Sequence, residues 1–527
     1  MRRRAMAGVV GLATAAAALA GCGSDPSALE PRAGPAAARQ VGGDQPGPGG
    51  LAAGKRPPQR SGVVRAAVAS ARAMGPQALG VQSFAAVRDI GPNVFASPFV
   101  TPAPQNEPAI AVSPRNSARL AASSNDYRLG SPQCGTYAST DGGASWQDIG
   151  PGVLPLAAGF TSGGDPSVTF GPGGTAYFTC LEFNGFTGAS AIVVGRSIDL
   201  RSAELLTPVV ADTAGSLFFN DKPYTAFDTN PASPYRGRIY VTWTRFASTP
   251  TGEFAGSPIY IASSTDRGRS WSTPRPVAPA GFSASQGAVP AVGPNGELYV
   301  AFENFNTVGE VNQVLVSRSL DGGRTFGTPV RAADVYDICP RVVFNSCSLR
   351  NSFFRVNSFP SVAVDPRRGH VFVTWGDYRL GSAKAFIVRS TSRGERWGPE
   401  QAVSNESPND QVFPWVAATP DGAPNVVYYD RRDDPNNFFL SVYVSTGRGG
   451  GLRFEPAVRV SSGPSNPDVQ FSGSFIGDYI GMAATAGRLN PIWTDTRRLV
   501  LSFPAQAAVT SPVYLTAGRA AALLASR

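Results

Sequence analysis

Histidine is almost absent from this chain, which has one, His370, among its 527 residues. A single imidazole excludes metal sites built from several histidines and argues against a Ser-His-Asp or Cys-His nucleophile. His370 lies in the segment PRRGH between two predicted strands, where a solvated turn residue is expected. Hydrolysis by carboxyl groups needs no histidine, so glycosidase chemistry stays open.

Lysine is nearly as scarce, because it occurs only at Lys55, Lys222 and Lys384. Arginine therefore carries most of the net charge of +9. The arginines are scattered or concentrated near the N-terminus, and no basic stripe is interleaved with aromatic residues. We therefore expect no nucleic-acid partner.

The chain has only five cysteines and no Cys-x-x-Cys motif, so a metal site is the weaker interpretation and we expect none. Four of the five remain after Cys22, which ends the leader described below. An even number in an exported protein favours two disulfides. Cys339 and Cys347 would close a small loop inside an insertion, and Cys134 and Cys180 would join neighbouring units of the repeat described below.

The N-terminus reads as a targeting segment. Three arginines at 2–4 precede an apolar stretch at 5–20 that is too short to span a bilayer. The stretch ends in LAGC, which resembles the lipobox of bacterial lipoproteins. Residues 1–21 are therefore predicted to be a signal peptide, with lipid on Cys22 anchoring an extracytoplasmic protein to the membrane, the outer membrane in a Gram-negative cell. An ordinary secretory signal is the alternative.

The remaining chain divides by composition. Residues 22–80 are rich in Ala, Gly, Pro and Arg without any apolar period, which predicts a disordered tether. Residues 81–513 form the folded domain, and residues 514–527 form a C-terminal tail. We expect a monomer.

An eight-residue pattern, Ser-x-Asp-x-Gly-x-Ser/Thr-Trp/Phe, occurs three times in the folded part. The copies are STDGGASW (139–146), STDRGRSW (264–271) and SLDGGRTF (319–326), and a fourth, STSRGERW (390–397), has Ser392 in place of Asp. Asp and Ser/Thr side chains can bond backbone N–H groups of a tight turn, Gly permits a positive φ, and the aromatic residue packs on the sheet. Repetition at this long period predicts an all-β fold, the β-propeller.

These octets resemble the Asp-box (BNR) repeats of the sialidase-like propeller superfamily. The resemblance implies that the octets lie on hairpins away from the ligand face. It also implies a glycan ligand or a carboxylate-bearing sugar as partner.

A second repeat gives the number of blades. Short apolar lead strands open near a proline at NEPAIAVSP, GDPSVTFGP, DKPYTAFD, GAVPAVGP, SFPSVAVDP and VFPWVAATP, and a seventh, GDYIGMAAT, has Tyr479 in place of proline. Their spacing fits four short strands each, so seven blades are predicted, with the six of sialidases as the alternative. A strand at about 82–93 is expected to complete the last blade and close the ring.

The ends of the second strands carry a repeated acid–arginine pattern on the face where the lead strands begin. Aromatic-x-Asp-x-Arg occurs three times, with Asp377 and Arg379, Asp430 and Arg432, and Asp495 and Arg497. On the same face Asp165, Asp221 and Asp478 precede inner strands. A repeated position is often architectural, so salt bridges that brace the blades are the favoured alternative to a binding site.

The resemblance to sialidases implies three arginines on a sugar carboxylate, an Asp acid/base, and a Tyr paired with an acid. It suggests four catalytic candidates and six binding candidates. Catalytic: Asp478, Tyr479, Tyr429 and Asp430; substrate-binding: Arg355, Arg379, Arg432, Arg497, Asp377 and Asp495. Arg355 is included because Phe354-Arg355-Val356 is the nearest match to the Phe/Tyr-Arg-Ile-Pro motif of the family, which is absent before the first lead strand.

The segment YDRRDDPNN (429–437) offers oxygen ligands for Ca²⁺ at Asp430, Asp433, Asp434 and Asn437. It lacks the EF-hand spacing, so a solvated acidic loop is favoured and no cofactor is expected.

The sequence thus predicts an envelope lipoprotein whose propeller recognises or hydrolyses glycans, as an exo-acting glycosidase of the sialidase-like type. A non-catalytic propeller that binds or scaffolds protein or polysaccharide partners is the alternative. Catalysis predicts that at least two of the four arginines converge, unpaired, beside a Tyr–acid pair.

Overall fold

A computed structural model gives the fold of residues 86–98, 101–150, 154–213, 215–305, 311–343, 346–448 and 450–516. All of them lie in one compact unit. They form strands β1 to β34 and two 3₁₀-helices, η1 (Ala280–Phe282) and η2 (Phe471–Gly473), with no α-helix in these ranges. The predicted signal peptide, Cys22 and the tether lie outside the described residues, as does the predicted tail (514–527) apart from residues 514–516, of which 514 and 515 belong to the last strand. In the described ranges, no helix has the length and apolar character to cross a membrane.

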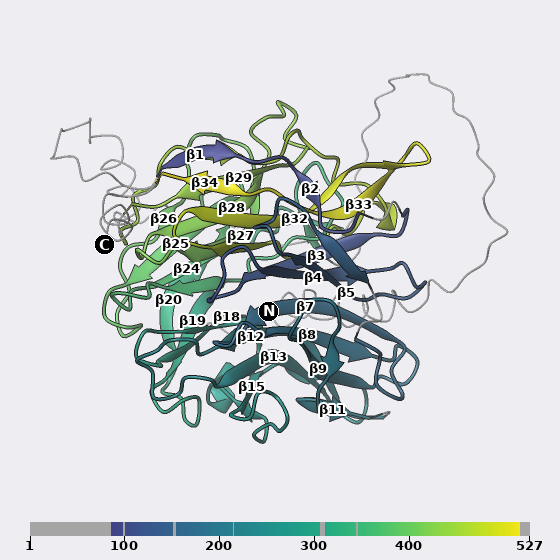
Figure 1. Cartoon of the computed structure of the whole chain (residues 1–527), viewed down its shortest axis with the longest axis vertical. Helices are drawn as coiled ribbons and strands as arrows, with labels where there is room; N and C mark the ends of the chain where they lie inside the picture. The colour runs from purple at the N-terminus through teal and green to yellow at the C-terminus, as the bar shows by residue number, and fades with distance from the viewer. Residues whose placement is uncertain are drawn as a thin grey trace, which may run out of the picture. The chain divides into compact units, whose positions relative to one another are not determined.

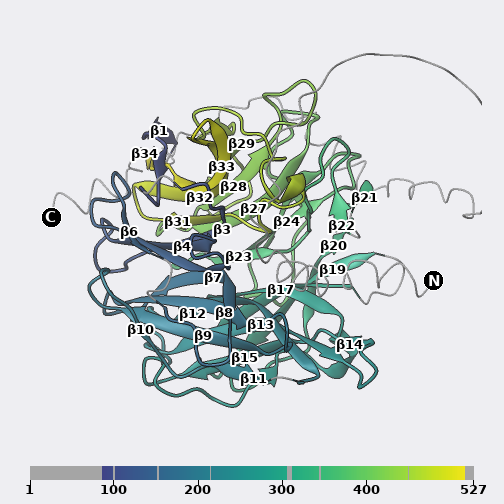
Figure 2. The same cartoon turned by 90° about the vertical axis from the view of Figure 1, so that its right-hand side faces the viewer.

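Seven sheets of four to six strands follow one another around a ring, which makes the fold a seven-bladed β-propeller (Figures 1 and 2). The inner strands β3, β7, β12, β17, β23, β27 and β31 contact one another in that order, and β31 contacts β3. The prediction of seven blades, one for each lead strand, is therefore confirmed.

Blades 1 to 3 have an antiparallel order that follows the chain from the axis outward. In addition, β11 (Val210–Asp212) pairs with β9, and β14 (Phe254–Gly256) pairs with β13. Their main strands are β3 (Gln105–Val112), β4 (Leu120–Asp126), β5 (Gln133–Ser139) and β6 (Gln147–Gly150); β7 (Ser162–Phe170), β8 (Ala176–Phe183), β9 (Ser190–Ser197) and β10 (Glu204–Leu205); and β12 (Phe218–Phe227), β13 (Ile239–Ser248), β15 (Ile259–Ser264) and β16 (Arg275–Pro276).

Blades 4 to 6 repeat the same order. A small hairpin, β21 (Arg341–Val343) and β22 (Ser346–Ser348), is inserted between blades 4 and 5. Their strands are β17 (Ser285–Val292), β18 (Leu298–Asn304), β19 (Asn312–Ser319) and β20 (Val330–Val335); β23 (Ser361–Val364), β24 (Val371–Asp377), β25 (Lys384–Ser390) and β26 (Gln401–Ala402); and β27 (Gln411–Ala418), β28 (Pro424–Asp430), β29 (Ser441–Thr446) and β30 (Val458–Arg459).

Blade 7 combines both ends of the described chain, as the sequence predicted. The N-terminal strands β1 (Val87–Ile90) and β2 (Val94–Phe95) pair with β34 (Val513–Leu515) and β33 (Phe503–Thr510). The inner strand β31 (Gly481–Ala484) pairs with the long β32 (Arg488–Val500). Hydrogen bonds between the two ends therefore close the ring.

The four octets lie in turns between the third and fourth strands of their blades. In the second octet the Asp266 carboxylate accepts the Ser270 backbone N–H at 3.0 Å, and the Ser264 hydroxyl accepts the Gly268 N–H at 2.8 Å. The first and third octets repeat these contacts. The hydrogen bonds that the residue types predicted for these turns are therefore present. The turns lie at the face opposite the start of the inner strands.

Both predicted disulfides are present. Cys134 of β5 is bonded to Cys180 of β8, which links blade 1 to blade 2, and both residues are buried. Cys339 and Cys347 close the inserted hairpin between blades 4 and 5.

Candidate functional site

The inner strands of five blades share a β-bulge near the axis. The first residue of each bulge has a positive φ, at Glu107 (52°), Asp165 (51°), Lys222 (50°), Gly287 (72°) and Phe413 (53°). A non-glycine residue in this region costs about 1–3 kcal/mol, and such strain persists only where the surrounding structure fixes it. The bulges of blades 1 to 3 bring charged side chains together, whereas those of blades 4 and 6 carry glycine and phenylalanine.

Lys222 lies at the centre of this charged group, 2% exposed. Its ammonium group donates to Asp478 of blade 7, and its Nζ lies 3.8 Å from Glu107 and 3.9 Å from Asp165. Arg355 binds the same Asp478 with two hydrogen bonds, from Nε at 2.7 Å and from Nη2 at 2.6 Å. Both cations of the cluster therefore converge on one carboxylate.

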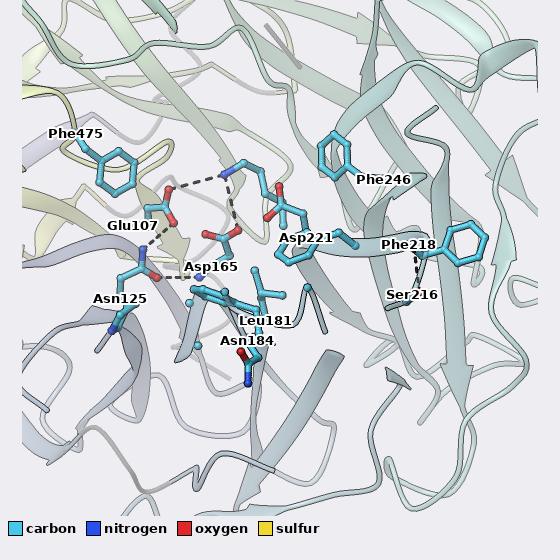
Figure 3. Close-up of a pocket in the computed structure, with 18 of the residues that line it drawn as sticks. Glu107, Asn125, Asp165, Leu181, Asn184, Ser216, Phe218, Asp221, Phe246 and Phe475 are labelled. Carbon is cyan, nitrogen blue, oxygen red and sulfur yellow. Dashed lines mark hydrogen bonds and ion pairs between the residues drawn. The ribbon is translucent and has the colours of Figure 1, made fainter. Parts of the chain in front are cut away.

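Glu107, Asp165 and Asp221 form the acidic side of the cluster, and Figure 3 shows their side chains close together. Hydrogen bonding with Glu107 and Asp221 contributes to a lowered pKa of the Asp165 carboxyl group. Asn125 fixes the arrangement, because its Nδ2 donates to Glu107 at 2.9 Å and its Oδ1 accepts the Asp165 backbone N–H at 2.8 Å. Glu107 also accepts the Asp478 backbone N–H at 3.0 Å.

The environment separates the pKa values of these neighbouring acids. Burial, together with the charge of Asp165, holds the pKa of Glu107 and that of Asp221 well above the ordinary range. Burial also acts on Asp165, but the charge of Lys222 and two hydrogen bonds lower its pKa. Arg355 and Lys222 likewise lower the pKa of Asp478. The environment therefore favours the protonated form of Glu107 and Asp221 and the ionised form of Asp165 and Asp478.

A pocket of about 300 Å³ opens onto this cluster. One end contains Glu107, Asp165, Asp221, Lys222 and Arg355. The wall of the pocket also includes apolar side chains from blades 2 and 3, and Figure 3 shows Phe218 and Phe246 apart from the charged group while Leu181 lies beside Asp165. These apolar residues are Leu181, Phe183, Leu217, Phe218, Phe219 and Phe246. The pocket therefore joins a hydrogen-bonding centre to aromatic surface.

The inserted segment between blades 4 and 5 positions Arg355. The Val356 N–H donates to the Cys347 carbonyl at 2.8 Å, and the Arg355 N–H donates to the Ser474 carbonyl at 3.0 Å. The guanidinium group also lies over the Phe475 ring, 4.5 Å from its centroid. The disulfide-closed hairpin and the segment before β31 thus hold Arg355 from two sides.

Of the predicted site residues, Arg355 and Asp478 meet in the cluster. Tyr479 is buried beside it, its hydroxyl donating to the Pro166 carbonyl at 2.9 Å. Tyr429 lies in the core between blades 6 and 7, where its hydroxyl bonds the Thr494 backbone. Tyr429 and its neighbour Asp430 do not line the pocket, so the structure does not unite the four catalytic candidates.

The repeated arginines do not converge on a ligand position. Arg379, Arg432 and Arg497 each bind the aspartate two residues earlier, Asp377, Asp430 and Asp495, with ion pairs of 2.7, 2.7 and 2.6 Å. Each of these arginines also bonds a further group beside it. This geometry contradicts the prediction that these three arginines bind a sugar carboxylate. Each guanidinium group is already paired with an aspartate at the end of its own strand, as the architectural alternative predicts.

The acidic segment 429–437 uses its oxygens internally. Asp433 accepts hydrogen bonds from Ser441 and Tyr443, and Asp434 accepts backbone N–H groups of the loop. Within the described ranges, no group of three or more His, Cys, Asp or Glu residues is arranged to hold a metal ion.

Sequence reasoning placed Asp165 and Asp221 on this face but did not make them site residues, and it missed Glu107 and Lys222. A signal was present: Glu107, Asp165 and Lys222 each directly precede the proline of a lead strand. Aligning the seven lead strands at that proline brings the three charges to one position.

No protein-family profile matches the chain, and no curated protein is similar to it in sequence. Among solved structures, a Dyadobacter fermentans protein of unknown function is similar over 82% of this chain and 99% of its own, with 12% identity and a TM-score of 0.46. A GH93 α-L-arabinofuranosidase of Fusarium graminearum covers 68% of this chain and 98% of its own (14%, 0.46), and a Hadza microbial sialidase covers 75% and 73% (13%, 0.42). These similarities are too distant to assign residues or chemistry to this chain.

Proposed function

We propose that the axial pocket binds the end of a glycan and that Asp221 and Asp165 hydrolyse its terminal glycosidic bond. The observation that carries the proposal is the proximity of Asp221 and Asp165 at the pocket wall (Figure 3), where burial raises the pKa of Asp221 and the charge of Lys222 lowers that of Asp165. Glycosidases need one carboxylic acid to protonate the leaving oxygen and one carboxylate to act as nucleophile or base. Asp221 takes the first role and Asp165 the second.

The rest of the pocket suits a sugar. Phe183, Phe219 and Phe246 offer apolar faces, while Asn125 and Glu107 offer polar atoms for hydroxyl groups. Pockets of this kind combine apolar walls with a few fixed polar groups that orient the ligand. A pocket favours the end of a chain over its interior, which supports exo-action.

The test is a screen of fluorogenic pentosides, hexosides and sialosides with the full chain carrying Cys22→Ala, so that no lipid can attach. Asp221→Asn and Asp165→Asn should each lower kcat/KM by about 10²–10⁴-fold. Asp89→Asn, an exposed acid on β1, is the matched control and should keep full activity. The rate should fall at high pH as Asp221 loses its proton, and at low pH as Asp165 gains one.

A binding module is the second candidate, and the close contact of Asp165 with Asp221 favours it. Two carboxyl groups that share a hydrogen bond are nearer than the about 5–5.5 Å of retaining glycosidases. Binding to a glycan array without turnover of any glycoside, lost in the Asp221→Asn chain, would establish this function in place of hydrolysis.

The location of the protein follows from its disulfides, which indicate an extracytoplasmic protein. We further propose a lipid anchor at Cys22. Metabolic labelling with a fatty-acid probe should mark the wild-type chain and leave the Cys22→Ala chain unlabelled.

A further inference from the structure

Blade 3 lines the pocket with apolar side chains as well as with an acid. Leu217, Phe218 and Phe246, here called the blade 3 wall, line the pocket together with Asp221. Phe218 and Asp221 belong to the same strand, β12, and Phe246 lies on the neighbouring β13, opposite Phe219. Three residues of an extended strand span about 10 Å. A ligand that contacts Asp221 can therefore also reach the Phe218 ring, which Figure 3 shows apart from the charged group.

Part of this wall exposes apolar surface to solvent. Leu217 is 43% exposed and Phe218 is 40% exposed. The Phe218 ring is held in place, because the Arg245 guanidinium carbon lies 4.1 Å from its centroid and Arg245 is itself paired with Asp212 at 3.0 Å. Covering exposed apolar surface is favourable, and a surface that is already fixed loses little entropy on binding. The blade 3 wall is therefore suited to an apolar group of a ligand.

Polar partners for a ligand are scarce beside the wall. Besides the charged cluster, the described residues of blades 2 and 3 contribute three polar side chains to the pocket lining: Asn184, Ser216 and Ser248. The Asn184 amide is used internally, because its Nδ2 donates to the Gly159 carbonyl at 3.0 Å and its Oδ1 accepts two backbone N–H groups of its loop. The Ser216 oxygen accepts the Phe218 N–H at 3.0 Å. A second sugar ring would leave most of its hydroxyl groups without partners here, which is costly.

We propose that the pocket takes a glycoside whose aglycone is an uncharged apolar group, aryl or alkyl, with the sugar at the charged cluster and the aglycone on the blade 3 wall. This inference rests on the proposed function, because it takes the same pocket as the glycan site and names the class of substrate. The bond that is hydrolysed then joins a sugar to an apolar group rather than to a second sugar.

The positions of the two proposed catalytic acids agree with this orientation. In glycoside hydrolysis the general acid protonates the oxygen of the leaving group, so the aglycone lies on the side of that acid. Asp221, the proposed acid, belongs to blade 3 with the apolar wall, whereas Asp165 belongs to blade 2. The blade that would protonate the leaving oxygen is therefore the blade that would hold the apolar group attached to it.

The first measurement needs no knowledge of the sugar. The uncharged apolar dye N-phenyl-1-naphthylamine is titrated into the full Cys22→Ala chain, and its fluorescence is followed. We expect saturable binding that Phe218→Ser and Phe246→Ser each weaken by about 2–10-fold, because each removes an aromatic contact. Ile198→Ser is the matched control, since Ile198 is 71% exposed and follows the third strand of blade 2 at the face of the octet turns. It should bind the dye as the parent chain does, and thermal melts confirm that every variant is folded.

The second measurement is isothermal titration with thioglycosides, whose sulfur linkage resists hydrolysis, of the sugar that the glycoside screen or the glycan array selects. The compounds are the methyl, phenyl and octyl thioglycosides and the corresponding S-linked disaccharide. We expect the phenyl or the octyl compound to bind about tenfold or more tightly than the methyl compound, and the disaccharide to gain no such advantage. The tighter of the two shows whether the aglycone is aryl or alkyl. Its binding should have a more negative heat-capacity change, and Phe218→Ser should reduce the preference.

The outcomes separate this inference from the proposed function. Absence of dye binding, or dye binding that is unchanged in both phenylalanine variants, overturns the inference, as does a disaccharide that binds as tightly as the phenyl and octyl compounds. Turnover of glycosides alongside any of these results would leave the proposed function standing. Dye binding at the blade 3 wall in a chain that neither hydrolyses nor binds any glycoside would overturn the proposed function and confirm the apolar wall alone.

Discussion

Lys222 is the residue on which the charge balance of the axial cluster depends. It is one of three lysines in the chain, and its ammonium group contacts acids from three blades. Removing one partner of a buried ionic network costs far more than the network contributes as a whole, since the remaining charges stay buried. The loss of any one charged residue of the cluster should therefore lower the free energy of unfolding of the protein.

We predict that Lys222→Met lowers the free energy of unfolding by about 3–5 kcal/mol, because Asp165 and Asp478 lose a shared counter-ion. Urea denaturation followed by tryptophan fluorescence measures the change. The control is Arg331→Met, which breaks an exposed 3.0 Å ion pair with Asp334 and should cost less than about 1 kcal/mol. Similar losses in the two variants would contradict a buried network.

Lys384 gives a second prediction, on pH. Burial lowers its pKa to about 8, while its Nζ donates to the Ser407 carbonyl at 2.7 Å and to the Asn409 carbonyl. The unfolded chain keeps the ordinary value of about 10.4 and so binds more protons between these two pH values. Wild-type stability should therefore rise from pH 8 to pH 10.4, by up to about 3 kcal/mol, relative to Lys384→Met. Parallel pH curves for the two chains would show that Lys384 is not the source.

Among the structural elements, the octet turns show how local residues specify local geometry. In the fourth octet the Ser392 hydroxyl accepts the Arg396 N–H at 2.9 Å, where the intact octets use a carboxylate that accepts two or more donors. Ser392→Asp should therefore stabilise the protein by about 0.5–1 kcal/mol, measured as a rise in Tm. The reverse change, Asp266→Ser in the second octet, should lower Tm by a similar amount.

The elements that sequence analysis predicted correctly depend on neighbours in the chain. The octet turns, the lead strands and the short disulfide loop 339–347 each arise within a few residues, so residue type and spacing were sufficient. The Asp–Arg pairs at the strand ends are local too, and their repetition already favoured the architectural interpretation. The sequence analysis wrongly predicted a sugar-binding site at these pairs, because the aspartates already occupy the guanidinium groups of the arginines.

The axial cluster could not be derived in the same way. Glu107 and Asp478 are 371 residues apart, and they meet only because blade 7 closes on blade 1. Arg355 reaches Asp478 from an insertion whose path no periodic pattern specifies. The sequence analysis named Arg355 and Asp478 separately. Only the closed ring brings them together with Lys222 and the other acids of the cluster.

At the scale of the whole molecule, the ring is closed by non-covalent contacts in blade 7. Val87 and Ile90 of β1 pair with β34 and pack against the core of blades 6 and 7. By contrast, the seam between blades 1 and 2 is held by the Cys134–Cys180 disulfide. The axial site is bordered by blades on both sides of the closure, because Glu107 of blade 1 meets Asp478 of blade 7, so the site is lost only when the ring opens.

We predict that a chain beginning at Gly91, which lacks β1, loses about 2 kcal/mol of stability, because two half-buried side chains and three strand pairings are removed. The control is a chain beginning at residue 83, which keeps β1 and should match the full Cys22→Ala chain in urea. Loss of β1 also uncovers one edge of β34, so the shorter chain should show concentration-dependent association by light scattering. Because β1 pairs with β34, packs on the core of blades 6 and 7 and is not part of the pocket lining, glycan affinity below the unfolding transition should stay the same. Equal stability of the two truncated chains would show that β33 and β34 close the ring without help from the N-terminal strand.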